Sequence, residues 1–174
     1  MLINRKDIYE GRVIKVSVDT VDLPNGVRLP LEIVRHPGGA AAVAIDADNR
    51  VCLLHQYRHA AGGFIYELPA GKLEPDEPPA VTVRRELAEE AAMSAARWEP
   101  LGNFYSSPGV FTEVIHLYLA TGLTPVEAAP EQGEVFQVEW WPLELAVARA
   151  RSGELTDGKT IIGILRAAAL KKIA

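Results

Sequence analysis

Apolar and polar side chains alternate near the start of the chain. The alternation runs over residues 13–21 and returns over residues 29–33, with Pro24-Asn25-Gly26 between the two stretches. A period of two is typical of a half-buried strand, and the intervening residues favour a tight turn. The pattern therefore predicts an N-terminal antiparallel β-hairpin.

Apolar runs and segments with helical spacing follow one another through the rest of the chain. The predicted strands cover residues 39–45, 50–56, 64–68, 98–104, 114–120 and 135–141, and the predicted helices cover residues 78–92, 143–151 and 159–172. Several strands precede the first helix, and the helices do not alternate regularly with strands. We therefore expect a mixed α+β fold, an α/β/α sandwich around a mixed β-sheet, with a hairpin region over residues 1–38 and a main domain over residues 39–174.

Composition narrows the classes of function. The chain has 174 residues and a net charge of −5, and it contains no run of basic residues that could follow a nucleic-acid backbone. Its apolar runs are far shorter than the roughly 20 residues that a membrane span needs, and its start does not resemble a secretory signal. The single cysteine, Cys52, lies in an apolar run and is expected to be buried. These features predict a cytoplasmic protein that binds neither nucleic acid nor membrane.

Three glutamates lie close together on the helix predicted over residues 78–92. At 3.6 residues per turn, Glu86, Glu89 and Glu90 share one face, while another face is apolar and able to pack on a sheet. Arg85 can contact Glu89 at the four-residue spacing, so a solvent-exposed, salt-bridged face is one explanation. A hard cation is the other, because it would offset the mutual repulsion of three carboxylates, and the carbonyl of Ala70 could add a further oxygen ligand.

The same segment resembles the conserved box of the Nudix hydrolases. The matching positions are Gly71, Glu77, Arg85, Glu86, Leu87, Glu89, Glu90 and Met93. Ala92 departs from the family pattern, which has a glycine there that ends the helix in a left-handed conformation. Ala92 therefore implies either a strained helix cap or a helix that runs on through Ala95.

The resemblance implies a divalent-metal site. Glu86 and Glu90 would be the main ligands together with the carbonyl of Ala70, and Glu89 would bind directly or through water. Arg85 would orient these carboxylates, and Glu77 would brace the preceding loop. The cofactor would be Mg²⁺, with Mn²⁺ and Zn²⁺ as alternatives.

Segments outside the box are similar to the ADP-ribose pyrophosphatase branch of the family. They are Tyr9-Glu10-Gly11-Arg12-Val13, Gln56-Tyr57-Arg58, Glu67-Leu68-Pro69-Ala70-Gly71 and Ser107-Pro108-Gly109. Members of this branch hydrolyse ADP-ribose to AMP and ribose 5-phosphate. The similarity implies that Arg58 contacts phosphate or ribose, that Ser107 and Gly109 approach the terminal ribose, and that Glu74 lies close to the metals. Glu32 would lie near the nucleobase, although an exposed strand carboxylate is an equal alternative.

The branch also implies a general base and an oligomeric state. Glu134, on the loop before the last predicted strand, would activate water, with Glu89 as the alternative. A homodimer is expected, in which N-terminal strands cross to the partner. Two alternatives stay open at this point: hydrolysis of another nucleoside diphosphate derivative such as GDP-mannose, and nucleotide binding without hydrolysis. The intact glutamates argue against the second.

Overall fold

The computed structural model describes residues 1–127, 133 and 135–171. Its contacts divide it into two compact units. Unit 1 comprises Met1–Gly38 and Phe104–Val114, and unit 2 comprises Gly39–Asn103 and Ile115–Ala174. Among the described residues, no helix is long and apolar enough to cross a membrane.

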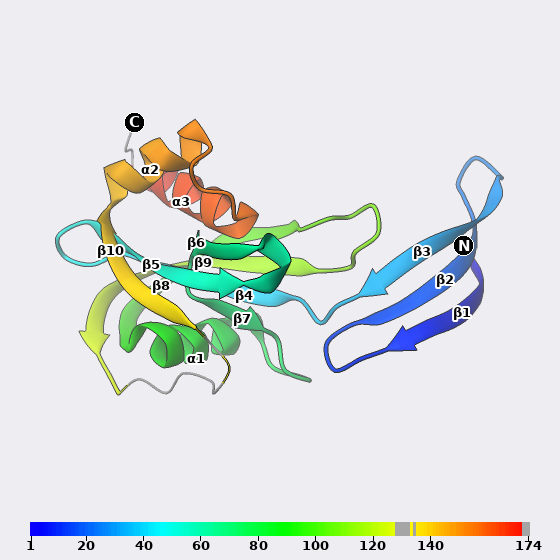
Figure 1. Ribbon diagram of the computed structural model, residues 1–174, viewed down its shortest axis with the longest axis horizontal. Coiled ribbons are helices and arrows are strands. Elements are labelled where there is room, and N and C mark those ends of the chain that lie inside the picture. Colours follow the sequence, from blue (N-terminus) through cyan, green and yellow to red (C-terminus); the bar gives the residue numbers. More distant parts are fainter. Residues whose placement is uncertain (128–132, 134, 172–174) are drawn as a thin grey trace. The chain divides into compact units, whose positions relative to one another are not determined.

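Unit 1 is built on a three-stranded antiparallel sheet (Figure 1). Its order is β1 (Leu2–Glu10), β2 (Lys15–Asp22) and β3 (Arg28–Arg35), so the predicted hairpin is confirmed as β2 and β3. The sequence did not predict β1, because all of its residues are exposed and their hydrophobicity has no clear period. Beyond the sheet, Val34 exchanges backbone hydrogen bonds with Val110 and Thr112 at 2.7 and 3.0 Å, which ties the second segment of unit 1 to β3.

The most buried side chains of β2 are polar. Ser17 and Asp19 are 1% and 6% exposed, whereas the valines that alternate with them are only half-buried. Asp19 accepts hydrogen bonds from Ser17 at 2.7 Å and from Arg5 and Arg35 at 3.2 and 2.5 Å. These donors satisfy the carboxylate and cover it, which explains why the polar face is the buried one.

Unit 2 contains two sheets. One has the order β7 (Ala70–Lys72), β4 (Gly39–Ala44), β9 (Val114–Pro125) and β8 (Met93–Tyr105), and it is mixed because β4 is antiparallel to β7 and parallel to β9. The other has the order β10 (Phe136–Pro142), β5 (Arg50–Arg58) and β6 (Gly63–Glu67), all antiparallel. The remaining elements are the short 3₁₀ helix η1 (His59–Ala61), α1 (Pro79–Ala91), α2 (Leu143–Ser152) and α3 (Gly158–Leu170).

Strand β4 is buried on both faces, between α1 on one side and α3 on the other (Figure 1). Its alanines at even positions pack with Val83, Leu87 and Ala91 of α1. On the opposite face, a Cβ added to Gly163 of α3 would lie 3.0 Å from Val43 Cγ2 and 2.7 Å from Leu68 Cδ1. Helices therefore cover both faces of the sheet, and the predicted α/β/α sandwich is confirmed.

Candidate active site

Helix α1 buries two of its glutamates. The helix packs Val83 and Leu87 against the sheet, and Glu86 and Glu90 lie along the edge of this face at 8% and 4% exposure. Buried carboxylates are costly unless other groups compensate their charge. The explanation of a solvent-exposed helix face is therefore wrong for these two side chains.

The backbone of β7 approaches both buried glutamates. Ala70 N donates a 2.8 Å hydrogen bond to Glu90 Oε2. A Cβ added to Gly71 would overlap the carboxylate of Glu86. Residue 71 must therefore be glycine if Glu86 is to keep this position.

Arg85 joins the acidic residues around α1. It donates to Glu77 through Nε and Nη2 at 3.1 and 3.2 Å, and through Nη1 to Glu86 at 2.8 Å and to Glu89 at 2.9 Å. The predicted contact between Arg85 and Glu89 is confirmed. Hydrogen bonding to Glu77 is the largest cause of the raised pKa of Arg85, so this guanidinium stays charged. We call Glu77, Glu86, Glu89, Glu90 and Arg85 the α1 acid cluster.

Glu77 connects this cluster to the loop before α1. Its carboxylate accepts hydrogen bonds from Thr82 Oγ1 at 2.8 Å and from Glu74 N at 3.2 Å, in addition to those from Arg85. The hydrogen bond from Arg85, aided by Thr82 and the Glu74 backbone, lowers the pKa of Glu77 to about 2. Glu74 itself is exposed and forms an ion pair with Lys72.

Helix α1 ends in a left-handed residue. Ala92 has φ 54° and ψ 37°, and its N–H donates to the carbonyl of Leu87. Strand β8 begins at the next residue, Met93. Of the two alternatives for Ala92, the strained cap is therefore confirmed and the longer helix is wrong.

The α1 acid cluster offers only oxygen ligands. No group of three or more His, Cys, Asp or Glu side chains in the described part of the chain is already arranged around a metal position. The donors nevertheless fit a hard divalent cation, because Glu86 and Glu90 are buried side by side against Ala70 and Gly71 and carry carboxylates in excess of the one guanidinium.

A second charged cluster surrounds Glu67, at the end of β6. Glu67 is 2% exposed and accepts hydrogen bonds from Arg58 Nε at 2.7 Å, Arg58 Nη2 at 3.0 Å and Lys159 Nζ at 2.5 Å. Lys159 also lies 3.1 Å from Asp157. Burial raises the pKa of Glu67, but the hydrogen bonds from Arg58 and Lys159 outweigh it and leave that pKa below its ordinary value. We call Arg58, Glu67, Asp157 and Lys159 the Glu67 cluster.

The sequence did not identify Glu67 or Lys159 as site residues. Glu67 belongs to the Glu-Leu-Pro-Ala-Gly run and directly precedes the segment that carries Ala70, which was the available signal. Hydrogen bonding to Glu67 raises the pKa of Arg58, and the charge of Glu90 adds to the shift, so Arg58 lies within electrostatic reach of the α1 acid cluster.

The other predicted site residues are distributed as follows. Glu32 is exposed on β3 of unit 1. Ser107 and Gly109 are exposed in a turn of unit 1, in which the Ser107 carbonyl accepts from Val110 N at 3.2 Å and Phe111 N at 2.9 Å. Glu134 lies outside the described residues. The structure thus brings Ala70, Arg85, Glu86, Glu89 and Glu90 together within unit 2.

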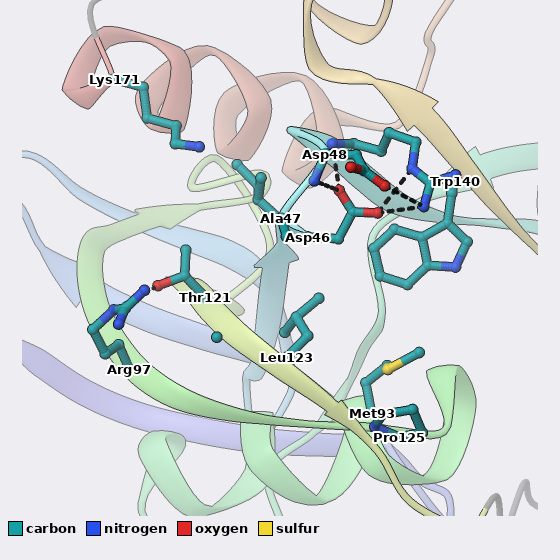
Figure 2. A pocket seen from close by; sticks show the side chains of 13 residues that line it. Asp46, Ala47, Asp48, Met93, Arg97, Thr121, Leu123, Pro125, Trp140 and Lys171 are labelled. Carbon is teal, nitrogen blue, oxygen red and sulfur yellow. Dashed lines mark hydrogen bonds and ion pairs between the residues drawn. The ribbon is translucent and has the colours of Figure 1, made fainter.

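A concavity of about 700 Å³ lies at the opposite end of β4 from β7 (Figure 2). Trp140, Leu123 and Met93 line it together with charged residues. Three of these charged residues pair with one another: Arg50 lies 2.8 Å from Asp46 and 3.4 Å from Asp48. None of the predicted site residues lines this pocket, so we assign the chemistry to the α1 acid cluster.

Comparisons with known proteins agree with this assignment. Residues 35–161 match the NUDIX domain. The chain belongs to the Nudix family.

Its relatives include a methanol dehydrogenase activator from Bacillus methanolicus, 41% identical over 93% of this chain and 89% of that protein. An ADP-ribose pyrophosphatase from Bacillus subtilis is 37% identical over the same shares of the two chains. The crystal structure of an ADP compounds hydrolase superposes with a TM-score of 0.85 over 99% of this chain and 94% of that one, at 19% identity, and confirms the Nudix fold.

Proposed function

We propose that this Nudix enzyme hydrolyses the pyrophosphate bond of ADP-ribose. Water adds its oxygen to one phosphorus atom, the bridging P–O bond breaks, and the products are AMP and ribose 5-phosphate. The observation that carries this function is the α1 acid cluster held against the backbone of Ala70 and Gly71. The ADP-ribose pyrophosphatase among the relatives supports the choice of substrate.

Mg²⁺ or Mn²⁺ is the cofactor that the donors favour. Glu86, Glu90 and the carbonyl of Ala70 would hold it, with Glu89 as a further ligand, directly or through water. Zinc prefers nitrogen and sulfur, which this donor set does not provide. When bound, such a cation neutralises diphosphate charge and acidifies a coordinated water.

The protein's own residues orient the carboxylates and supply the general base. Arg85 fixes the carboxylates of Glu86 and Glu89 through its hydrogen bonds, and Glu77 holds Arg85 in turn. Glu134 stays our candidate for the general base, with Glu89 as the alternative. Glu89 is 28% exposed at its side chain, so solvent can reach it. Arg58 would contact a phosphate or ribose through its planar guanidinium.

We also propose a homodimer formed through unit 1. The apolar side chains of Leu2, Ile8 and Tyr9 in β1 are 48%, 54% and 58% exposed. Exposed apolar side chains on an edge strand are typical of surfaces that pair with another chain. Glu32, Ser107 and Gly109 would contribute to the nucleoside and ribose sites. A single species of monomer mass in light scattering at micromolar concentration would contradict the dimer. A cytoplasmic location stays a prediction.

A substrate panel tests the proposed activity. Purified protein is incubated with Mg²⁺ and ADP-ribose, GDP-mannose, NADH or a diadenosine polyphosphate, and the products are separated by chromatography. The expected result is release of AMP and ribose 5-phosphate from ADP-ribose at the highest kcat/KM. Preferred cleavage of GDP-mannose or NADH would show that ADP-ribose is not the main substrate. If no compound gave a product, the result would favour a protein that binds nucleotides without hydrolysing them.

A further inference from the structure

We infer that Glu67 and Lys159 are positioning residues, which hold the guanidinium of Arg58 at the angle at which it receives a phosphate or ribose of the substrate. This inference rests on the proposed function, because it concerns the same substrate. It adds to that function two residues that do not touch the substrate themselves.

Arg58 is anchored along the edge of its guanidinium that carries Nε and Nη2. Its Nε and Nη2 donate to the two carboxylate oxygens of Glu67 at 2.7 and 3.0 Å, which is the bidentate geometry of an arginine–carboxylate pair. That pairing directs the edge of the guanidinium carrying Nη1 away from Glu67. The side chain of Arg58 is 44% exposed, whereas that of Glu67 is 3% exposed. Arg58 can therefore present its outer edge to a ligand while Glu67 stays covered.

Glu67 is itself fixed from a distant part of the chain. Lys159, 92 residues further on, donates to Glu67 Oε2 at 2.5 Å and is 15% exposed at its side chain. Asp157 holds Lys159 at 3.1 Å and also caps α3, where its Oδ2 accepts from Thr160 N at 3.0 Å. The start of α3 therefore determines where the Glu67 carboxylate lies.

The same helix start is tied to the segment that approaches the α1 acid cluster. Thr160 Oγ1 accepts a 2.8 Å hydrogen bond from Leu68 N, one residue after Glu67. Two residues later, Ala70 N donates to Glu90. A single short segment thus carries the anchor of Arg58 and the backbone that meets Glu90, and this arrangement sets the position of the guanidinium relative to the acidic residues.

The charges argue for orientation over simple attraction. The Glu67 cluster contains two carboxylates and two cations, so its formal charge is zero. A cluster of this kind adds little net attraction for a diphosphate. Its effect on a ligand would come from the fixed direction of the Arg58 donors, and misdirected donors lose much of their value.

A double-mutant cycle tests this inference. KM and kcat for ADP-ribose are measured at saturating Mg²⁺ for wild type, Glu67→Gln, Arg58→Ala and the double variant. Glu67→Gln should raise KM about tenfold, as expected when a supporting partner is removed, with a smaller change in kcat. In the Arg58→Ala background, Glu67→Gln should have no further effect on KM, because it acts through Arg58.

Two further variants separate orientation from charge and from folding. Arg58→Lys keeps the charge but loses the planar fork, so its KM should approach that of Arg58→Ala. Asp46→Asn breaks another arginine–carboxylate pair, that of Arg50 at 2.8 Å, at the far end of β4 and should leave KM unchanged. If Glu67→Gln does not fold, Lys159→Gln takes its place in the cycle, with an expected rise in KM of about threefold or more.

Additive effects of Glu67→Gln and Arg58→Ala on KM would overturn the inference. So would a Glu67→Gln protein with a lowered Tm and a normal KM, because Glu67 would then be merely structural. If wild type does not hydrolyse ADP-ribose, the proposed function fails separately, and the cycle is run on the Kd of ADP-ribose by calorimetry. The same non-additivity is then expected in Kd, and absence of ADP-ribose binding would reject the inference as well.

Discussion

The α1 acid cluster and the Glu67 cluster use arginine in opposite ways. In the α1 acid cluster, one guanidinium serves Glu77, Glu86 and Glu89, and Glu90 adds a fourth carboxylate. In the Glu67 cluster, one buried carboxylate accepts hydrogen bonds from two cations, Arg58 and Lys159. Asp157 adds a second negative charge, which makes the formal charge of the cluster zero. The first cluster has carboxylates in excess, and the second is neutral.

This difference separates two tasks within one unit of the protein. Excess carboxylates held close together favour the binding of a cation, because a cation relieves their mutual repulsion. A neutral network gives no such driving force, but it restricts the orientation of the side chains in it. We therefore expect changes in the α1 acid cluster to alter metal dependence and turnover, and changes in the Glu67 cluster to alter substrate affinity.

Glu90→Gln should have the largest effect. The variant removes one charge from a proposed metal ligand, while its amide oxygen can still accept from Ala70 N, so folding should be preserved. We expect kcat to fall by about 100-fold or more in an ADP-ribose assay with Mg²⁺. Glu144→Gln, in an exposed position of α2, is the control and should have normal turnover. Near-normal turnover of Glu90→Gln would refute the ligand assignment.

Gly71→Ala should reduce activity without unfolding the protein. The new methyl group would displace the Glu86 carboxylate, and that flexible side chain can move at small cost to stability. We expect kcat/KM to fall about tenfold and the Mg²⁺ concentration for half-maximal activity to rise. Gly63→Ala is the matched control, because a Cβ at Gly63 meets no atom within 4 Å. If both variants behave alike, the close approach of Glu86 to Gly71 has no functional role.

Because of Glu77, the stability of the protein should vary with pH in the acidic range. Its pKa is about 2 in the folded protein, where Arg85 is the main cause, and its ordinary value is 4.5. A carboxyl group with a depressed folded pKa stabilises the protein fully above about 4.5 and loses this contribution as the pH falls towards 2. Glu77→Gln should therefore be less stable than wild type at neutral pH.

Urea unfolding at several pH values measures this dependence. The difference in unfolding free energy between wild type and Glu77→Gln should shrink as the pH falls through this range. The exposed Glu99→Gln variant is the control and should follow wild type throughout. A difference that stays constant down to pH 2 would show that Arg85 does not hold Glu77 ionised.

Ala92→Gly should have the smallest effect, and a favourable one. A non-glycine residue in the left-handed region costs about 1–2 kcal/mol, and the greater freedom of glycine in the unfolded chain offsets about 0.4–1 kcal/mol of the gain. We expect a net stabilisation of about 0.5–1 kcal/mol by urea unfolding, with unchanged kcat. Ala88→Gly, inside the same helix, should instead destabilise by about 0.5–1 kcal/mol. A destabilised Ala92→Gly protein would contradict the strained cap.

The sequence predicted the elements whose signals are local. The period of two over residues 13–21 and 29–33 indicated β2 and β3, and the predicted helix over residues 78–92 agrees with α1. It did not predict β1, which is exposed throughout, or β7, which has three residues and is defined by its pairing with β4. The burial of Asp19 in β2 could not be predicted either, because the arginines that cover it come from other strands.

The same limit applies to the site. The α1 acid cluster could be predicted because its members lie within one helix and the loop before it, so their spacing determines their positions. The pair of Glu67 and Lys159 could not be predicted, because 92 residues separate them and the packing of α3 brings them together. Interactions of this kind leave no spacing pattern in a single sequence.

The fit of α3 against the sheet has a consequence for the distance that Lys159 must span. At Gly163 any larger side chain would press on Leu68 and Val43, so the glycine allows α3 to pack closely against the sheet. Lys159 lies one turn before Gly163 in the same helix, and its reach to Glu67 depends on that close approach. An apolar contact in the core thereby limits where the guanidinium of Arg58 can lie.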